Sequence, residues 1–539
     1  MASKYALVVD TKRCIGCWSC AVACKLENNI PDQVWYKRVE TVGGASPNTP
    51  AGTYGDCTLS YRPMGCMHCD SPSCVEVCPV GATWKDEETG VVMQDPEMQI
   101  VTDKVWHELA FGLESLGAKK DKIRMRTAEM AAYFGMQGIF DKKITELSGG
   151  QKQLLNLAGV MTSCPKILLL DEPTSQLDPV AAENFISTVA RINRELGVTV
   201  VMTEHRLEEV FALADRVVVM DGGRVVSDTP PRQLCNGGTD GFLSLAAPAP
   251  VRIFSSVAPA EELPLTVREA AQRLGKLIRD PKINQIENNA ALPDKTALEL
   301  KDVSFRYEKE QPNIINELSL KVPEGCVLSI LGGNAAGKST LLRLVAGILP
   351  VQGGKIKFGG KDRKKSGMTV GYMPQNPQTL FTANSLRKEL AGERLEEAAR
   401  LTKLTELLDR HPYDLSGGEQ QRAAMAKLLL ADPDIYLLDE PTKGMDCEFK
   451  QCLAEIFDSL KARGKTVITV SHDVEFCARS SDICAMLFDG GIAGVADTRS
   501  FFSGNYFYTT AANRLSRQVF KNCVTDADVI ELCRENMSN

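Results

Sequence analysis

A pair of short motifs occurs twice in this chain, in the same order and at the same spacing. Residues 147–151 read LSGGQ and residues 415–419 read LSGGE, and each is followed, after the same number of residues, by an apolar run that ends in LDEPT. Two of the five histidines, His205 and His472, follow these runs at nearly the same distance. This repeat predicts two copies of one α/β unit, in which the apolar runs are strands of a parallel sheet buried on both faces.

The second copy contains a phosphate-binding loop. Residues 332–339 read G-x4-G-K-S and lie between an apolar run at 326–331 and a helical pattern at 339–348. The backbone N–H groups of such a loop, together with the N-terminus of the following helix, surround anionic phosphates. We expect Lys338 to add a positive charge at the β- and γ-phosphates and Ser339 to bind Mg²⁺.

The same copy also supplies acidic residues for hydrolysis. The apolar strand predicted at 435–438 places Asp439 and Glu440 at the carboxyl edge of the sheet, where folds of this type bind ligands. We expect Asp439 to hold Mg²⁺ through water and Glu440 to orient or deprotonate the attacking water. The second copy therefore predicts an ATPase whose cofactors are ATP and Mg²⁺.

The first copy has no phosphate loop. No G-K-[ST] triplet precedes Gln94, the residue that takes the place of Gln375 in the second copy. The strand that should neighbour the apolar strands predicted at 165–170 and 198–203 is therefore missing. We expect the truncated sheet to have an exposed edge and uncovered apolar surface.

A cysteine cluster near the N-terminus indicates a metal centre. Half of the 18 cysteines lie within the first 78 residues, and eight of these form a C-x2-C-x2-C-x3-C motif and a C-x2-C-x4-C-x3-C motif followed by proline. These spacings favour 4Fe–4S clusters over a zinc site, which needs only four ligands, and over disulfides, which fit poorly with a cytosolic ATPase. The predicted ligands are Cys14, Cys17, Cys20, Cys24, Cys66, Cys69, Cys74 and Cys78.

From about residue 92 onward, the ordered motifs resemble the ATP-binding cassette (ABC) ATPases. Residues 94–117 and 502–513 resemble the tandem ATPase of energy-coupling factor (ECF) importers, which take up vitamins and transition-metal ions. The resemblance implies that Tyr307 stacks on adenine, that Gln375 senses the nucleotide and the membrane subunit, and that His472 contacts the γ-phosphate. Glu440, His472 and Gln375 are the catalytic set that it implies.

The resemblance also implies how the two copies share nucleotide. ABC ATPases close head to tail, with each nucleotide between the phosphate loop of one copy and the signature loop of the other. The signature loop of the first copy, residues 148–151, would therefore face the phosphate loop of the second. At most one ATP site would then be active. The implied nucleotide-binding set is Tyr307, Gly332, Asn334, Gly337, Lys338, Ser339, Thr340 and Asp439, with Ser148, Gly149, Gly150 and Gln151 from the first copy. Ala335 stands where the family usually has glycine, which predicts a strained turn.

The first 92 residues are similar to another family. Residues 13–31 and 63–84 resemble the electron-transfer iron–sulfur subunit of the dimethyl sulfoxide reductase family, which carries four cysteine motifs and four 4Fe–4S clusters; only two of the motifs occur here. The two family patterns meet at residues 92–94 without a linker. Natural fusions usually join complete domains at flexible segments. The junction therefore suggests a deletion fusion or two genes joined in error.

The expected fold is α/β, with P-loop ABC cassettes and an N-terminal partial ferredoxin-like region. The expected segments are a 4Fe–4S region at 1–92, a truncated cassette at 93–226, a solvated linker at 227–296 with one helix around 266–278, a complete cassette at 297–515 and a tail at 516–539. The net charge of −7 gives no overall attraction to nucleic acid, and no apolar run approaches the roughly 20 residues that span a bilayer.

We therefore expect a cytoplasmic ATPase that lies on the inner face of the plasma membrane only through its partners. Those partners are the transmembrane coupling subunit and the substrate-binding membrane subunit of an ECF importer. The alternatives are an electron-transfer subunit of a molybdopterin oxidoreductase, a non-functional fusion product and a ribosome-recycling ABC ATPase. The last family also places iron–sulfur clusters before two cassettes but keeps both phosphate loops.

Overall fold

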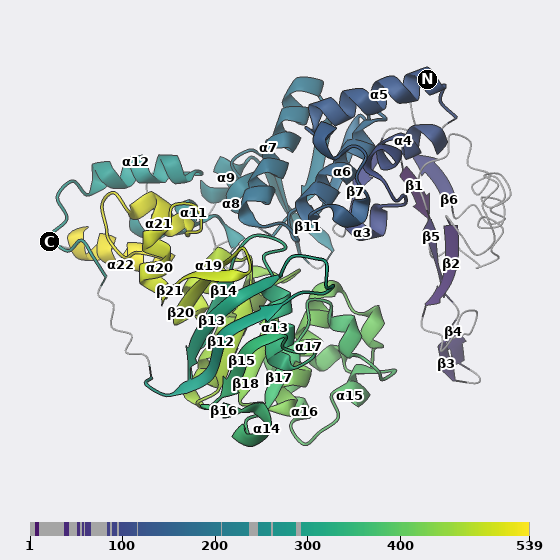
Figure 1. The fold of residues 1–539 in the computed structure, drawn as a ribbon. Coiled ribbons are helices and arrows are strands. Elements are labelled where there is room, and N and C mark those ends of the chain that lie inside the picture. The colour runs from purple at the N-terminus through teal and green to yellow at the C-terminus, as the bar shows by residue number, and fades with distance from the viewer. Residues whose placement is uncertain are drawn as a thin grey trace. The chain divides into compact units, whose positions relative to one another are not determined.

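The computed structural model divides into two compact units, Met1–Glu204 and His205–Asn539 (Figure 1). Its described residues are 91–93, 96–115, 117–205, 207–221, 223–236, 246–259, 262–286 and 293–537, together with the backbone of short strands between residues 6 and 90. The eight cysteines predicted as cluster ligands lie outside the described residues. Within the described part of the chain, no helix combines the length and apolar character needed to cross a membrane.

Short antiparallel strand pairs precede the cassettes. They are β1 (Ala6–Val9) with β6 (Thr83–Asp86), β2 (Lys37–Val42) with β5 (Ser60–Gly65), and β3 (Ala51–Thr53) with β4 (Asp56–Thr58). The next strand, β7 (Thr89–Val92), is different because it pairs in parallel with β8 (Ile167–Asp171). Strand β7 therefore belongs to the sheet of the first cassette, although it precedes the boundary predicted at residue 92.

The first cassette has a parallel sheet in the order β7-β8-β9, where β9 is Thr199–Thr203. Its helices are α3 (Pro96–Gln99), α4 (Val105–Ser115), α5 (Lys120–Tyr133), α6 (Gly149–Met161) and α7 (Pro179–Leu196). Local sequence sets the helix ends: Ser148 and Gln151 form a capping box at the start of α6, and Asp178 caps α7 before Pro179.

The sheet of the first cassette ends at β9, as expected from the missing strand. Val201 in the middle of β9 is 54% exposed, whereas every residue of the corresponding strand in the second copy, β19 (Thr466–Val470), is buried. The next two strands, β10 (Val217–Asp221) and β11 (Arg224–Thr229), form a two-stranded sheet of their own. Large apolar side chains are exposed on it: Val218, Met220, Val225 and Val226. The prediction of uncovered apolar surface is confirmed.

The second cassette is complete. Its six-stranded sheet has the order β17 (Val370–Met373), β18 (Ile435–Asp439), β19, β14 (Val327–Leu331), β20 (Ile483–Phe488) and β21 (Gly491–Asp497). Strand β14, which leads into the phosphate loop, lies between β19 and β20 and fills the place that is vacant in the first copy. A four-stranded antiparallel sheet comprises β13 (Ile315–Pro323), β12 (Thr296–Phe305), β15 (Gly353–Phe358) and β16 (Lys361–Asp362).

Two apolar cores hold this cassette together. One lies between the two sheets and includes Leu300, Leu328 and Ile468. The other lies between the six-stranded sheet and its helices and includes Phe449 and Tyr436. The helices that position the site are α13 (Lys338–Ala346), α17 (Gly417–Ala431), α18 (Cys447–Ala462) and α19 (Val474–Ser480).

The segment between the copies and the C-terminal tail form a common helical core. Their helices are α11 (Ala249–Val257), α12 (Val267–Leu277), α21 (Ala511–Ser516) and α22 (Asp526–Met537). Phe254, Leu274, Phe520 and Leu532 are buried together there. Helix α12 confirms the helix expected around 266–278, but the expectation of a solvated linker is wrong because both segments bury apolar faces against each other.

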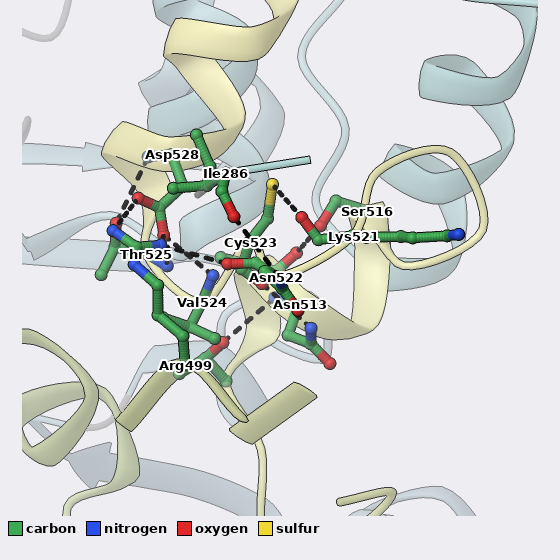
Figure 2. Close-up of polar contacts among 12 residues, drawn as sticks. Ile286, Arg499, Asn513, Ser516, Lys521, Asn522, Cys523, Val524, Thr525 and Asp528 are labelled. Carbon is green, nitrogen blue, oxygen red and sulfur yellow. Dashed lines mark hydrogen bonds and ion pairs between the residues drawn. The ribbon is translucent and has the colours of Figure 1, made fainter. Parts of the chain in front are cut away.

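Polar contacts attach α22 to the second cassette (Figure 2). Arg499 of α20 (Thr498–Gly504) donates to both carboxylate oxygens of Asp528, at 2.8 and 2.9 Å. The backbone N–H groups of Val524 and Thr525 also donate to Asp528, each at 2.9 Å. Burial opposes ionisation of Asp528, but these hydrogen bonds outweigh it and hold the pKa below its ordinary value.

Candidate nucleotide site

The phosphate loop follows a strand that is buried along its whole length, β14. The loop needs glycine at both ends: Gly332 has φ 156° and Gly337 has φ 98°, and a Cβ on Gly332 would lie 2.3 Å from the carbonyl oxygen of Leu487. Lys338 is buried at the start of α13, and its Nζ donates to the carbonyls of Gly332 and Gly333 at 2.9 and 2.8 Å. The loop therefore holds the Lys338 ammonium against its own backbone carbonyl groups.

Two further expectations about this loop concern Ala335 and Tyr307. Ala335 has φ 62°, a left-handed conformation that a residue with a Cβ rarely adopts, which agrees with the predicted strain. The Tyr307 ring is half exposed beside the loop, and its hydroxyl lies 3.1 Å from Oγ1 of Thr340. An exposed aromatic face next to a phosphate loop is suited to stacking on a base.

Asp439 ends β18 and is fully buried, at 0% exposure. Ser339 Oγ donates to its Oδ1 at 3.0 Å, and the Tyr372 hydroxyl donates to its Oδ2 at 3.3 Å. Burial raises the pKa of Asp439, and the hydrogen bonds from Ser339 and Tyr372 oppose that rise. A serine hydroxyl beside a carboxylate is the hard oxygen set that Mg²⁺ prefers, so these residues fit the ion that the sequence predicts.

Glu440 and His472 come together at the same edge of the sheet. Glu440 has φ 53°, and its N–H donates to the carbonyl of Val470 at 2.9 Å. Nε2 of His472 lies 3.3 Å from Oε1 of Glu440, and the His472 backbone N–H donates to Oε2 at 3.2 Å. The left-handed turn therefore directs the carboxylate toward the histidine, an arrangement that can orient a water molecule and accept its proton.

Gln375 lies two residues beyond β17 and is exposed. Its carbonyl accepts a hydrogen bond from Gln421 Nε2 of α17 at 3.3 Å. Helix α17 begins directly after Ser416, which caps it through a reciprocal hydrogen bond with Glu419. The Gln375 segment is thus tied to the helix that carries the signature motif of its own copy.

The sequence reasoning missed Tyr372 and Arg343. Tyr372 lies on β17 and donates to Asp439, and Arg343 lies on α13, where its positive charge opposes the rise in the pKa of Asp439. The available signal was a hydroxyl residue in a strand that otherwise consists of apolar residues and glycine, just before Gln375.

The first copy repeats the backbone of the site without its phosphate loop. Glu172 has φ 41°, as Glu440 has a positive φ, and Ser148 caps α6 as Ser416 caps α17. Asp171, in contrast to Asp439, is exposed and accepts a hydrogen bond from Thr203 Oγ1 on the neighbouring strand at 2.8 Å. The acidic pair is present in both copies, but only the second has a buried carboxylate beside a lysine-bearing loop.

A parallel sheet with a lysine-bearing glycine loop, a buried strand-end aspartate and an adjacent glutamate defines the class of P-loop ATPases. The family model described as ABC transporter matches residues 75–175 and 315–443, and the model described as 4Fe-4S dicluster domain matches residues 13–82. The chain carries a 4Fe–4S domain on this evidence.

Relatives with ATP-binding cassettes match most of the chain. It is 40% identical over 471 residues to an ABC transporter ATP-binding protein of Bacillus cereus, with 84% of each chain covered. It is 31% identical over 442 residues to one of Clostridium tetani, with 79% of this chain and 99% of the relative covered. The chain therefore belongs to the ABC transporter ATP-binding proteins and is an ATPase of that family.

Among solved structures, the complex of the archaeal ribosomal stalk protein aP1 with the ribosome recycling factor aABCE1 has a TM-score of 0.51 and 22% identity, and covers 77% of this chain and 76% of that one. This likeness establishes a shared fold. The cassettes of this chain belong to the ABC family, whose ATPase domains generally act with membrane subunits.

Proposed function

We propose that this chain is the energy-coupling subunit of an ECF-type importer and hydrolyses ATP at a single site in its second cassette. The observation that carries the proposal is the assembly of Lys338, Ser339, Asp439, Glu440 and His472 at one sheet edge, through the contacts described above. The first cassette supports the limit to one site because it lacks the loop and its aspartate is exposed.

The residues of the second cassette divide the chemistry among themselves. Lys338 and the loop N–H groups bind the β- and γ-phosphates and offset their charge. Glu440 accepts the proton of the attacking water, while the His472 contacts keep its carboxylate in place. Ser339 and Asp439 would hold Mg²⁺, which would neutralise charge on the phosphate oxygens.

The catalytic assignment is tested by replacing Glu440 with glutamine. Glu440→Gln keeps the shape of the side chain but removes the proton acceptor, so ATP turnover should fall at least about 100-fold while binding of a fluorescent ATP analogue persists. The first copy offers a matched control: Glu172→Gln changes the equivalent glutamate, whose copy has no phosphate loop, and should leave turnover unchanged. Full turnover in Glu440→Gln would remove Glu440 from the proposed site.

The importer assignment rests on the resemblance of residues 94–117 and 502–513, and on the membership of the chain in the ABC transporter ATP-binding proteins. The segments after Gln94 and Gln375 are the proposed docking regions for a transmembrane subunit. Co-purification from detergent extracts of the source membranes should recover that subunit with the tagged chain. Recovery with soluble partners alone would argue against an importer.

A second candidate function is electron transfer, favoured by the match of residues 13–82 to a 4Fe-4S dicluster domain. It predicts iron and acid-labile sulfide in chain purified without oxygen, and a visible absorbance that bleaches on reduction. Tryptic peptides that span the junction, residues 86–104, test whether both regions occur in one polypeptide. Flanking peptides found without the junction peptide would indicate separate proteins.

A further inference from the structure

The two oxygens of the Asp439 carboxylate have different partners. Oδ1 accepts from Ser339 on the phosphate-loop side, and Oδ2 accepts from Tyr372 on the neighbouring strand β17. Ser339 is also the proposed Mg²⁺ ligand, and a hydroxyl that turns to a metal ion holds the carboxylate less firmly. Tyr372 is the partner that can keep the orientation of the carboxylate independently of the ion.

The first copy shows an aspartate of the same type without this tyrosine. Val91 on β7 pairs with Leu169, as Tyr372 on β17 pairs with Leu437, so Val91 occupies the register of Tyr372. There the aspartate takes its hydroxyl partner from Thr203 instead. The Tyr372 contact is thus a feature of the copy that has a phosphate loop and is not required for a strand to occupy this position.

We propose that Tyr372 is a positioning residue for the metal-binding carboxylate of Asp439. This inference deepens the proposed function, because it concerns the same ATP site. It predicts that loss of the tyrosine hydroxyl weakens the divalent ion bound with the nucleotide, while the affinity for nucleotide without the ion stays the same.

The test uses Tyr372→Phe, which removes only the hydroxyl, in the full chain carrying Glu440→Gln so that no turnover occurs. Binding of a fluorescent ATP analogue is measured in EDTA and over a Mg²⁺ titration, and Mn²⁺ affinity is measured by electron paramagnetic resonance. Loss of one hydrogen bond to a carboxylate should raise the Mg²⁺ concentration at half effect about tenfold. Binding in EDTA should change less than about twofold.

Tyr436→Phe is the matched control, because it removes a hydroxyl from a buried tyrosine on β18 that bonds to Asp432, away from the loop. It should leave the Mg²⁺ titration unchanged. An unchanged Mg²⁺ requirement in Tyr372→Phe, or an equal loss of binding in EDTA, would overturn the positioning role. If the Glu440→Gln chain binds no Mg²⁺–nucleotide at all, the proposed function fails instead.

Discussion

Asp528 provides the most sharply defined test of how the C-terminal helices are held. The substitution Asp528→Asn keeps the volume of the side chain and places a neutral amide against the guanidinium of Arg499. Asp528 is 7% exposed and Arg499 is 29% exposed, and the carboxylate accepts from Arg499, Val524 and Thr525. The amide can replace at most part of this acceptor set, and the arginine loses its countercharge.

The magnitude follows from burial. Breaking a fully buried ion pair by removing one partner costs about 3–5 kcal/mol. Arg499 retains some contact with water, so we expect a smaller loss of about 2–3 kcal/mol in the local stability of α22. Amide protection in α22 should therefore fall about 30- to 150-fold, whereas strand β14 should keep its protection.

Hydrogen–deuterium exchange read by mass spectrometry measures both elements in one experiment. Glu531→Gln, an exposed charge change on the same helix, is the control and should leave exchange unchanged. The pKa of Asp528 is depressed in the folded chain, which fixes the pH dependence of stability. The stabilisation from Asp528 is complete above the ordinary pKa of 3.8 and is lost as pH falls through the lower folded pKa. A fall spread equally over β14 and α22, or no fall, would refute the reasoning.

Three other predictions concern charge, pairing and the exposed edge. Burial, with help from Glu208 and Asp526, raises the pKa of Glu475 to about 8, so stability should decline as pH rises from 4.5 to 8, and urea midpoints of Glu475→Gln should lack this slope. A normal slope in that variant would exclude Glu475 as its source. Ser148→Arg should abolish ATP turnover if the cassettes pair head to tail, as their sequences predict; unchanged turnover would favour pairing between two chains. Val201→Lys should lower light scattering at 37 °C severalfold, because a charge on the edge strand opposes strand pairing, and equal scattering would show that aggregation begins elsewhere.

The local chemistry of the site was predictable from the sequence because it depends on fixed spacings. The apolar run before Asp439 and Glu440 predicted that they lie at a strand end, and the repeated LDEPT motif takes the same turn in both copies, where Glu172 and Glu440 share a positive φ. The missing central strand of the first copy predicted an exposed sheet edge, and β9 forms that edge.

The parts that the sequence did not predict depend on contacts between distant segments. Tyr372 and Asp439 are far apart in the chain and meet only because β17 and β18 are neighbours in one sheet. The segment around residues 249–277 has a mixed composition interrupted by three prolines, yet α11 and α12 bury Phe254 and Leu274 against C-terminal helices that lie more than 200 residues later. The pattern of residues within one segment does not show which distant segment it packs against.

Strand β7 shows what a parallel sheet demands of the strand at its edge. Its four residues pair with β8 through their backbones. The side-chain amides of Gln99 and Gln153 donate hydrogen bonds to the carbonyls of Val91 and Met93. Backbone pairing does not depend on the identity of the side chains. A short strand can therefore pair at this edge if its inward-facing residue is apolar, as Val92 is. The edge of a parallel sheet therefore constrains the shape and polarity of its last strand more than the identity of the residues in that strand.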